Sequence, residues 1–329
     1  MCCMLLAQIV EVRQPAEARK ARNAAVRPDR VSRERVEQFP GRPRGMLDVH
    51  PRRTRIVGAA LAAVLFAAVY TTADLTTWGQ AIENAFATAS DRARNAAYIP
   101  YEYLRLPPLR FETPTIAIGL LVLLVIAAVL RRWRQLFTVL VAVTASILSD
   151  DALTKVLGRP HLDPSAPAFD LAASYPSGHV VIVAALSMGS LIVVPRKWLR
   201  WCAPIVLGWT AMVASAVLAL GWHRPSDVIG GALLVCAVFL AASAIFDRTV
   251  EPIGPREVRA WVVVIVVLSL ATIMAIEPTV WHVPVTVATS LIATGLVAAT
   301  ALALCRSVWP SQRTEERYDP PPTSEPPPN

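Results

Sequence analysis

Eight blocks of apolar residues alternate with short polar stretches along the chain. Each block has close to the ~20 residues that an α-helix needs to cross the hydrocarbon core of a bilayer. Lipid offers no hydrogen-bond partners to the backbone, so segments of this composition must satisfy their N–H and C=O groups internally, as helices. We therefore predict an all-α fold, a polytopic transmembrane helical bundle. The predicted spans are 55–73, 114–131, 136–153, 179–195, 201–221, 227–246, 260–276 and 283–304.

The two ends of the chain have a different pattern. Residues 1–54 are rich in arginine, contain interspersed acidic residues and prolines, and lack apolar periodicity, so we predict a basic disordered tail. Residues 306–329 end in PPPTSEPPPN, a proline density that predicts a second disordered tail. Between the tails we distinguish residues 55–246, which contain the polar motifs described below, from residues 247–305, which add two further spans.

Basic residues predict the orientation of the spans. The stretches 131–134, 196–200 and 248–259 carry arginine or lysine and fall on the same side as the basic N-terminus. Lysine and arginine are enriched in cytoplasmic loops. We therefore expect a multi-pass cell-membrane protein with both termini in the cytoplasm. The loops 74–113 and 154–178 fall on the extracytoplasmic side.

Composition narrows the class of partner. The chain is 54% hydrophobic and carries a formal net charge of +8, but its arginines flank the apolar blocks. This placement predicts contact with membrane lipids rather than with nucleic acid, for which no motif is visible. The five cysteines have neither metal-ligand spacing nor a disulfide framework, and we expect no metal and no other cofactor. The sequence does not indicate an oligomeric partner.

Three polar motifs fall at the extracytoplasmic ends of predicted spans: KVLGRPH (155–161), PSGH (176–179) and GWHRPSD (221–227). The second opens a helix, where unpaired N–H groups and the helix dipole favour an anion. Gly178 permits close approach of a ligand oxygen, Ser177 offers a hydroxyl, and His179 can carry a proton near neutral pH. An ordinary helix start with an interfacial histidine is the alternative interpretation.

The other two motifs supply a nucleophile and positive charge. His223 and Asp227 are four residues apart, which stacks them one turn apart if the helix begins at Pro225. A carboxylate on one imidazole nitrogen makes the other a better nucleophile or base. Lys155 and Arg159 suit a phosphate. A solvated His–Asp pair and snorkelling cations are the alternatives. Together the motifs meet the needs of metal-independent phosphoryl transfer through a covalent intermediate.

The order Lys…Arg-Pro, Pro-Ser-Gly-His, His-x-x-x-Asp over residues 136–246 resembles the type 2 phosphatidic acid phosphatase superfamily of membrane lipid phosphatases, and GWHRPSD is similar to its actinobacterial members. The resemblance implies a six-helix phosphatase core, followed here by two extra spans. It also implies hydrolysis of a lipid phosphate monoester or pyrophosphate on the extracytoplasmic face. His223 is then the nucleophile that becomes phosphohistidine, Asp227 orients it, and His179 is the general acid and later the base. The implied phosphate-binding residues are Lys155, Arg159, Ser177 and Gly178.

Two departures from the family pattern stand out. Lys155 lies four residues before Arg159 rather than seven, so either the shorter linker is repacked or His161 occupies the place of the usual arginine. Asp151, near the outer end of the third predicted span, is a candidate pocket residue. Ala216 and Val217 occupy the places of the usual Ser-Arg, and Arg224 is the candidate replacement charge. These departures leave two alternatives open: a lipid phosphotransferase of the same fold, and a catalytically weak lipid-binding or scaffold protein. A transporter is disfavoured because no inverted repeat is visible.

Overall fold

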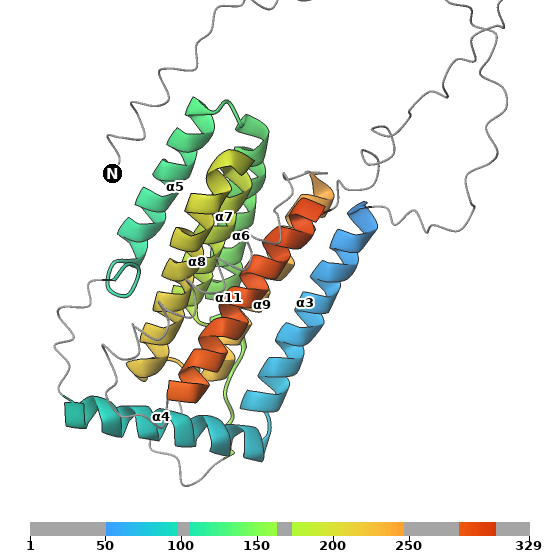
Figure 1. Cartoon of the computed structure of the whole chain (residues 1–329). Coiled ribbons are helices and arrows are strands. Elements are labelled where there is room, and N and C mark those ends of the chain that lie inside the picture. The colour runs from blue at the N-terminus through green and yellow to red at the C-terminus, as the bar shows by residue number, and fades with distance from the viewer. Residues whose placement is uncertain (1–50, 98–105, 163–172, 247–282, 307–329) are drawn as a thin grey trace, which may run out of the picture. The chain divides into compact units, whose positions relative to one another are not determined.

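The computed structural model describes residues 51–97, 106–162, 173–246 and 283–306, and in these residues every regular element is an α-helix (Figure 1). The predicted all-α fold is thereby confirmed. All described helices belong to one compact unit, residues 49–329. They are α3 (Pro51–Asp74), α4 (Thr77–Ala97), α5 (Glu112–Val129), α6 (Trp133–Val156), α7 (Gly178–Val193), α8 (Arg196–Ala219), α9 (Pro225–Ile245) and α11 (Val283–Arg306).

Six of the described helices are long and apolar enough to cross a membrane, namely α3, α5, α6, α8, α9 and α11. This supports the predicted multi-pass bundle. Helix α3 begins at Pro51, four residues before the predicted span. The predicted span 260–276, residues 1–50 of the predicted tail and residues 307–329 lie outside the described residues.

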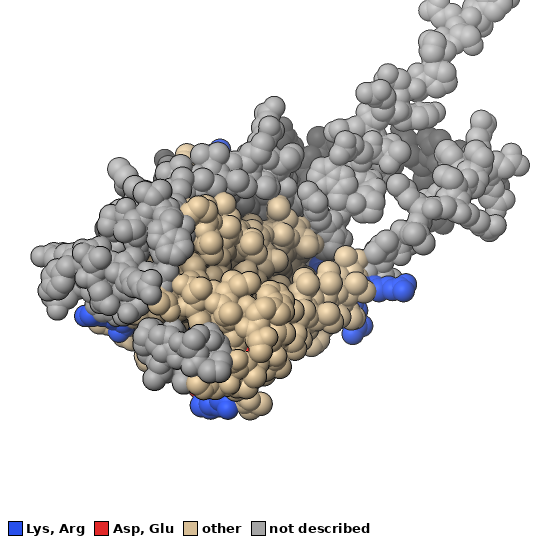
Figure 2. Space-filling view, turned by 90° about the horizontal axis from the view of Figure 1, so that it is seen from below, with Lys and Arg blue, Asp and Glu red and all other residues tan. Residues whose placement is uncertain are grey.

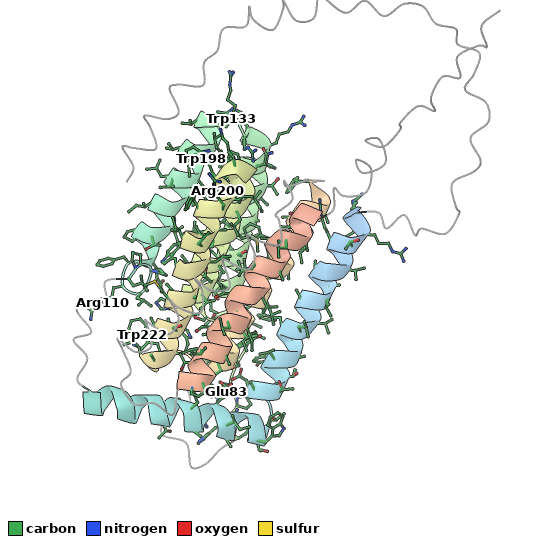
Figure 3. All side chains as sticks on the ribbon, viewed as in Figure 1. Glu83, Arg110, Trp133, Trp198, Arg200 and Trp222 are labelled. Carbon is green, nitrogen blue, oxygen red and sulfur yellow. The ribbon has the colours of Figure 1, made fainter. Side chains whose placement is uncertain are left out.

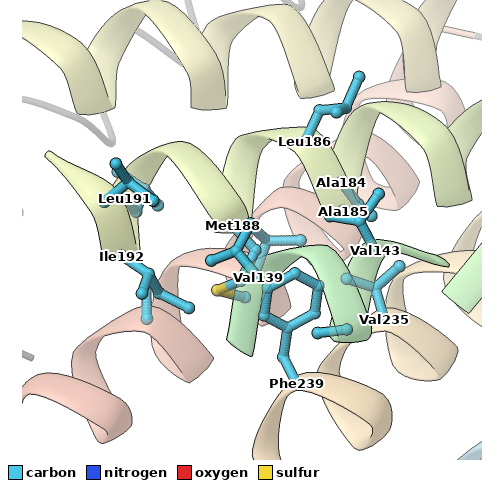
Figure 4. Close-up of a cluster of buried hydrophobic side chains, with 14 of the residues drawn as sticks. Val139, Val143, Ala184, Ala185, Leu186, Met188, Leu191, Ile192, Val235 and Phe239 are labelled. Carbon is cyan, nitrogen blue, oxygen red and sulfur yellow. The ribbon is translucent and has the colours of Figure 1, made fainter. Parts of the chain in front are cut away.

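Helix α7 has only 16 residues, and it packs against α5, α6, α8, α9 and α11. Association of helices in lipid depends on close van der Waals packing, to which small residues contribute by letting backbones approach. Accordingly, an added Cβ on Gly189 would lie 2.7 Å from a methyl group of Val139 in α6. Met188 of α7 and Phe239 of α9 are fully buried in the same apolar cluster (Figure 4). The helix that carries PSGH is therefore held on all sides by its neighbours.

Helix α4 was not predicted, because residues 74–113 were interpreted as a loop. It is amphipathic: Glu83 and Asn84 face the bundle and are 9% and 4% exposed, whereas Trp78 and Ile82 are each 61% exposed. Apolar and polar residues alternate with helical period along 77–97, and this pattern is the signal that the loop interpretation missed. In Figure 1, α4 crosses the lower ends of the long helices.

The polar motifs and the basic turns lie at opposite ends of the bundle. Figure 3 shows Glu83 and Trp222 at one end, and Trp133, Trp198 and Arg200 at the other. Seen from the α4 end, the described surface is mostly uncharged, and the visible lysine and arginine side chains lie at its edge (Figure 2). The bundle thus separates a motif-bearing end from a cation-rich end, as the spacing of motifs and spans predicts.

Gly230 provides a test of this packing. It lies against the ring of Tyr175, which is 2% exposed and donates a hydrogen bond to the carbonyl oxygen of Phe66 at 2.7 Å. A methyl group at position 230 would overlap the ring, so we expect Gly230→Ala to cost about 1–3 kcal/mol of stability and to lower the Tm by about 2–8 °C. Scanning fluorimetry of the detergent-solubilised protein measures the shift.

Gly295→Ala is the matched control, because Gly295 lies in α11 and an added Cβ there meets no atom within 4 Å. We expect this control to leave the Tm unchanged or to raise it slightly, since alanine has the higher helix propensity. Equal Tm values for the two variants would contradict the close contact between α9 and Tyr175.

Candidate active site

The first turn of α9 holds His223 and Asp227 together. Proline at position 225 begins the helix, and Asp227 in its first turn is fully buried. The Asp227 Oδ2 atom lies 3.4 Å from His223 Nδ1 and accepts hydrogen bonds from the Arg224 backbone N–H at 2.9 Å and from Ser174 Oγ at 2.7 Å. Because three groups converge on one oxygen, the carboxylate has a fixed position, and it favours a proton on His223 Nδ1.

The second nitrogen of His223 faces His179. His223 Nε2 and His179 Nδ1 are 3.4 Å apart, and the two rings meet nearly edge to face. The other nitrogen of His179, Nε2, lies 3.3 Å from the half-exposed Glu112 carboxylate at the start of α5. Trp222 lies beside the His179 ring, with centroids 5.5 Å apart. The side chains of His179 and His223 remain 16% and 12% exposed, so a ligand can reach both from outside.

The start of α7 is joined directly to the start of α9. The Ser177 N–H donates to the carbonyl oxygen of Asp227 at 3.0 Å, and Ser177 is fully buried. A Cβ on Gly178 would lie 2.9 Å from Asp150 Oδ2, so a carboxylate of α6 stands close to this helix start. The positive end of a helix dipole favours an anion. The predicted anion-binding position therefore has an anionic neighbour in the described conformation.

The two arginines have different surroundings. Arg224 is 6% exposed, and its Nη1 donates to Ser174 Oγ at 2.9 Å, beside the Asp227 carboxylate. The Arg159 guanidinium is buried in an ion pair with Asp74 at the end of α3, and its Nη2 donates to Asn84 Oδ1 at 2.9 Å. Arg224 is therefore adjacent to the His–Asp pair, whereas Arg159 is occupied by acidic and amide groups.

The remaining candidates lie at the surface. Lys155 Nζ pairs with Asp151 at 2.6 Å, and their side chains are 70% and 64% exposed. His161 is also exposed. The structure describes these three residues without bringing them into contact with either histidine.

Val217 takes part in the site through its backbone. Its side chain is fully buried in the apolar cluster beneath the site. The family that this chain resembles has an arginine at this sequence position. The Val217 carbonyl oxygen accepts the N–H groups of Trp222 at 3.0 Å and His223 at 3.3 Å. Gly221 has a φ of 66°, a value that glycine tolerates best, and this permits the turn. The end of α8 therefore positions the turn that carries His223.

Sequence reasoning missed a group of polar residues that contact this site: Asp74, Glu83, Asn84, Glu112 and Ser174. Glu83 is the most unusual, because it is buried in α4 and accepts a hydrogen bond from Ser226 Oγ at 3.1 Å. Burial raises the pKa of its carboxyl to about 7, and the negative charge of Asp227 acts in the same direction. The Ser226 hydrogen bond and the charge of Arg224 oppose this shift. A carboxyl group that changes charge near neutral pH thus lies next to the His–Asp pair.

No group of three or more His, Cys, Asp or Glu side chains with metal-binding geometry occurs among the described residues. The chemistry available at this end of the bundle is that of two facing imidazoles, a buried carboxylate and two guanidiniums. Such a set supports nucleophilic attack by one imidazole and proton transfer by the other.

Comparison with known proteins agrees with this chemistry. The family model of the PAP2 superfamily matches residues 135–251, which include α6 to α9, both histidines and Asp227. No curated protein and no solved structure matches the chain. The match over residues 135–251 confirms the resemblance to the PAP2 superfamily that the three motifs indicate.

Proposed function

We propose that this protein is an integral membrane lipid phosphatase that hydrolyses a lipid phosphate monoester or pyrophosphate through a phosphohistidine intermediate. The membrane-spanning helices and the family match support a phosphatase-type function at a membrane. The observation that carries the finer proposal is the line of contacts from Asp227 Oδ2 to His223 Nδ1 and from His223 Nε2 to His179 Nδ1, each 3.4 Å long.

In the first step, the lone pair of His223 Nε2 attacks phosphorus while the bond from phosphorus to the leaving oxygen breaks. Asp227 supports this attack because it stabilises the positive charge that develops on the imidazole. Protonated His179 gives its proton to the leaving oxygen. In the second step, neutral His179 takes a proton from water, the water oxygen attacks phosphorus, and the P–N bond breaks to release orthophosphate.

The resting distance between the histidines has a consequence for binding. Two nitrogens 3.4 Å apart leave no room for a phosphoryl group between them. Substrate must therefore move one ring aside. His179 is the ring that can move, because its second partner is the half-exposed Glu112, whereas His223 is held by fully buried Asp227.

The groups proposed to hold the phosphate are Arg224, Arg159 and the start of α7 at Ser177 and Gly178. Arg224 lies beside Asp227. Arg159 can serve this purpose with the guanidinium donors that do not pair with Asp74 or Asn84. Lys155, now paired with Asp151, and exposed His161 are placed for a headgroup that extends beyond the phosphate.

The position of these groups supports a lipid substrate and an extracytoplasmic site. They lie at the ends of apolar helices, so a headgroup can reach them while its acyl chains stay in the bilayer. The cation-rich turns lie at the other end of the bundle, and basic loops face the cytoplasm. A scaffold role is the second candidate, favoured by the apolar burial of Val217 at the place of a family arginine.

Substrates with different leaving groups distinguish the proposed roles of the two histidines. We expect His223→Ala to abolish phosphate release from every substrate, because it lacks the nucleophile. His179→Ala should lose about 10²–10⁴-fold on a lipid phosphate monoester. With p-nitrophenyl phosphate, kcat/KM should fall far less, because kcat/KM reports the first step and this leaving group departs without a proton. Steady-state kinetics of the purified protein in detergent measure the difference.

Equal losses for His179→Ala on the two substrates would contradict the general-acid role. Phosphate release by His223→Ala at the wild-type rate would contradict the assignment of His223 as the nucleophile. A control is Ile205→Ala, which changes an exposed side chain of α8 outside the proposed site.

The proposed orientation is tested by cysteine labelling in intact cells. Asp151 and Arg200 are both exposed and lie at the C-terminal part of α6 and the N-terminal part of α8, which are at opposite ends of the bundle. We expect a membrane-impermeant maleimide to label Asp151→Cys without permeabilisation and Arg200→Cys only after it, relative to the background of the native cysteines. The reverse pattern would place the site in the cytoplasm.

A further inference from the structure

Helix α4 lies outside the segment matched by the family, yet its buried side chains contact two of the three motifs. Gln80, Glu83 and Asn84 fall on one face of this helix and are 1%, 9% and 4% exposed. Polar side chains are rarely buried this far unless they are hydrogen-bonded. Each of the three has such a partner, and the partners belong to the proposed site.

Gln80 holds the backbone around Arg159. Its Nε2 donates to the carbonyl oxygens of Asp74 and Pro160, both at 2.6 Å. Its Oε1 accepts the N–H of Leu162 at 3.1 Å. One side chain therefore ties the end of α3 to the backbone on both sides of residue 161.

The Arg159 side chain is held by residues at the junction of α3 and α4. Its two terminal nitrogens are divided between Asp74 and Asn84, and the Arg159 and Asp74 side chains are only 3% and 4% exposed. A guanidinium presents several donors in one plane, so two acceptors at its edge determine where its remaining donors point.

Glu83 lies between Gln80 and Asn84 in the sequence and contacts the motif GWHRPSD (221–227). It accepts the hydrogen bond from Ser226, the residue before Asp227 in the first turn of α9. A carboxyl and an amide on neighbouring positions of α4 thus contact the His223 motif and the Arg159 motif respectively.

Charged groups near Glu83 lie on neighbouring elements. Asp74 lies on α3, Arg159 follows α6, and Arg224 and Asp227 lie at the start of α9. When Glu83 is neutral, the carboxylates of Asp74 and Asp227 balance the two guanidiniums. Ionised Glu83 adds a buried negative charge that opposes an incoming phosphate, and its pKa of about 7 places this change in the physiological range.

We propose that the α3–α4 corner, residues 74–84, is a positioning platform for phosphate binding: Gln80 and Asn84 hold the Arg159 segment, and neutral Glu83 holds the first turn of α9. These are positioning residues, because they touch motif residues and not the substrate. The proposal rests on the proposed phosphatase function, and it adds to the site an element that the family match does not include.

The test compares wild type with Asn84→Ala, Glu83→Ala and Glu83→Gln. The control is Ile82→Ala, an exposed position on the outer face of the same helix. Two readouts are made on the full-length protein in detergent: orthophosphate binding, from the rise of the Tm with phosphate concentration, and kcat and KM for a lipid phosphate between pH 5.5 and 8.5, a window around the usual pKa values. Phosphate binding does not require turnover, so it reports on the platform even if the protein hydrolyses nothing.

We expect Asn84→Ala to weaken orthophosphate binding and to raise KM, each roughly tenfold, with little change in kcat, because the charged Arg159 guanidinium loses its hydrogen bond to the Asn84 side-chain oxygen. Ile82→Ala should match wild type. Unchanged phosphate binding in Asn84→Ala, or an equal weakening in Ile82→Ala, would overturn the proposal. If Asn84→Ala binds orthophosphate more weakly but the wild type hydrolyses no lipid phosphate, the positioning platform stands and the proposed function is rejected.

Glu83→Gln separates positioning from simple stability. Its amide oxygen still accepts the Ser226 hydrogen bond and imitates the neutral acid. We expect near wild-type kcat/KM at pH 6 and, relative to wild type, a gain of roughly tenfold at pH 8.5, where ionised Glu83 opposes phosphate. Glu83→Ala should lower kcat at every pH, and Glu83→Gln should restore it. The ratio of the profiles cancels the titration of the other groups that the two proteins share. A flat ratio, or failure of Glu83→Gln to restore kcat, would overturn the role of Glu83.

Discussion

The site depends on one buried carboxylate. The side chain of Asp227 joins His223, the Arg224 backbone and the Ser174 hydroxyl, while its carbonyl oxygen accepts the N–H of Ser177. One residue therefore fixes the turn before α9, the segment before α7 and the orientation of an imidazole. An ionised carboxylate is strongly disfavoured in a dry environment without partners, so its burial requires these donors. The same requirement brings the two histidines together.

The surrounding charges follow from this constraint. The Arg224 guanidinium and the Asp227 carboxylate share the Ser174 hydroxyl, and Arg159 pairs with Asp74. Glu83 lacks a guanidinium in direct contact among its described hydrogen bonds, and burial raises its pKa to about 7. The buried end of the bundle is thus balanced when one carboxyl is protonated. A phosphate that enters this environment adds negative charge, which favours protonation of nearby groups. Binding and proton transfer are coupled in this account.

The sequence predicts those parts of the molecule that depend on local pattern. Span length and hydropathy predict the long helices, and a spacing of four residues predicts the stacking of His223 on Asp227. The meeting of His179 with His223 required more than spacing, since 44 residues separate them, and it was expected from motif order and the resemblance. Helix α4 was missed because its amphipathic pattern has low mean hydropathy. The contacts of Arg159 with Asp74 and Asn84 span 85 and 75 residues, and no local pattern encodes them.

The central claim is that His223 becomes phosphorylated during turnover. The most direct measurement mixes the purified protein with a lipid substrate carrying a labelled phosphate, stops the reaction in alkaline denaturant, and locates the label by peptide mass spectrometry. The account predicts an acid-labile phosphoryl group on His223 of the wild type and no label in His223→Ala. Phosphate release from wild type with no label on His223, or with the label on another residue, would contradict it.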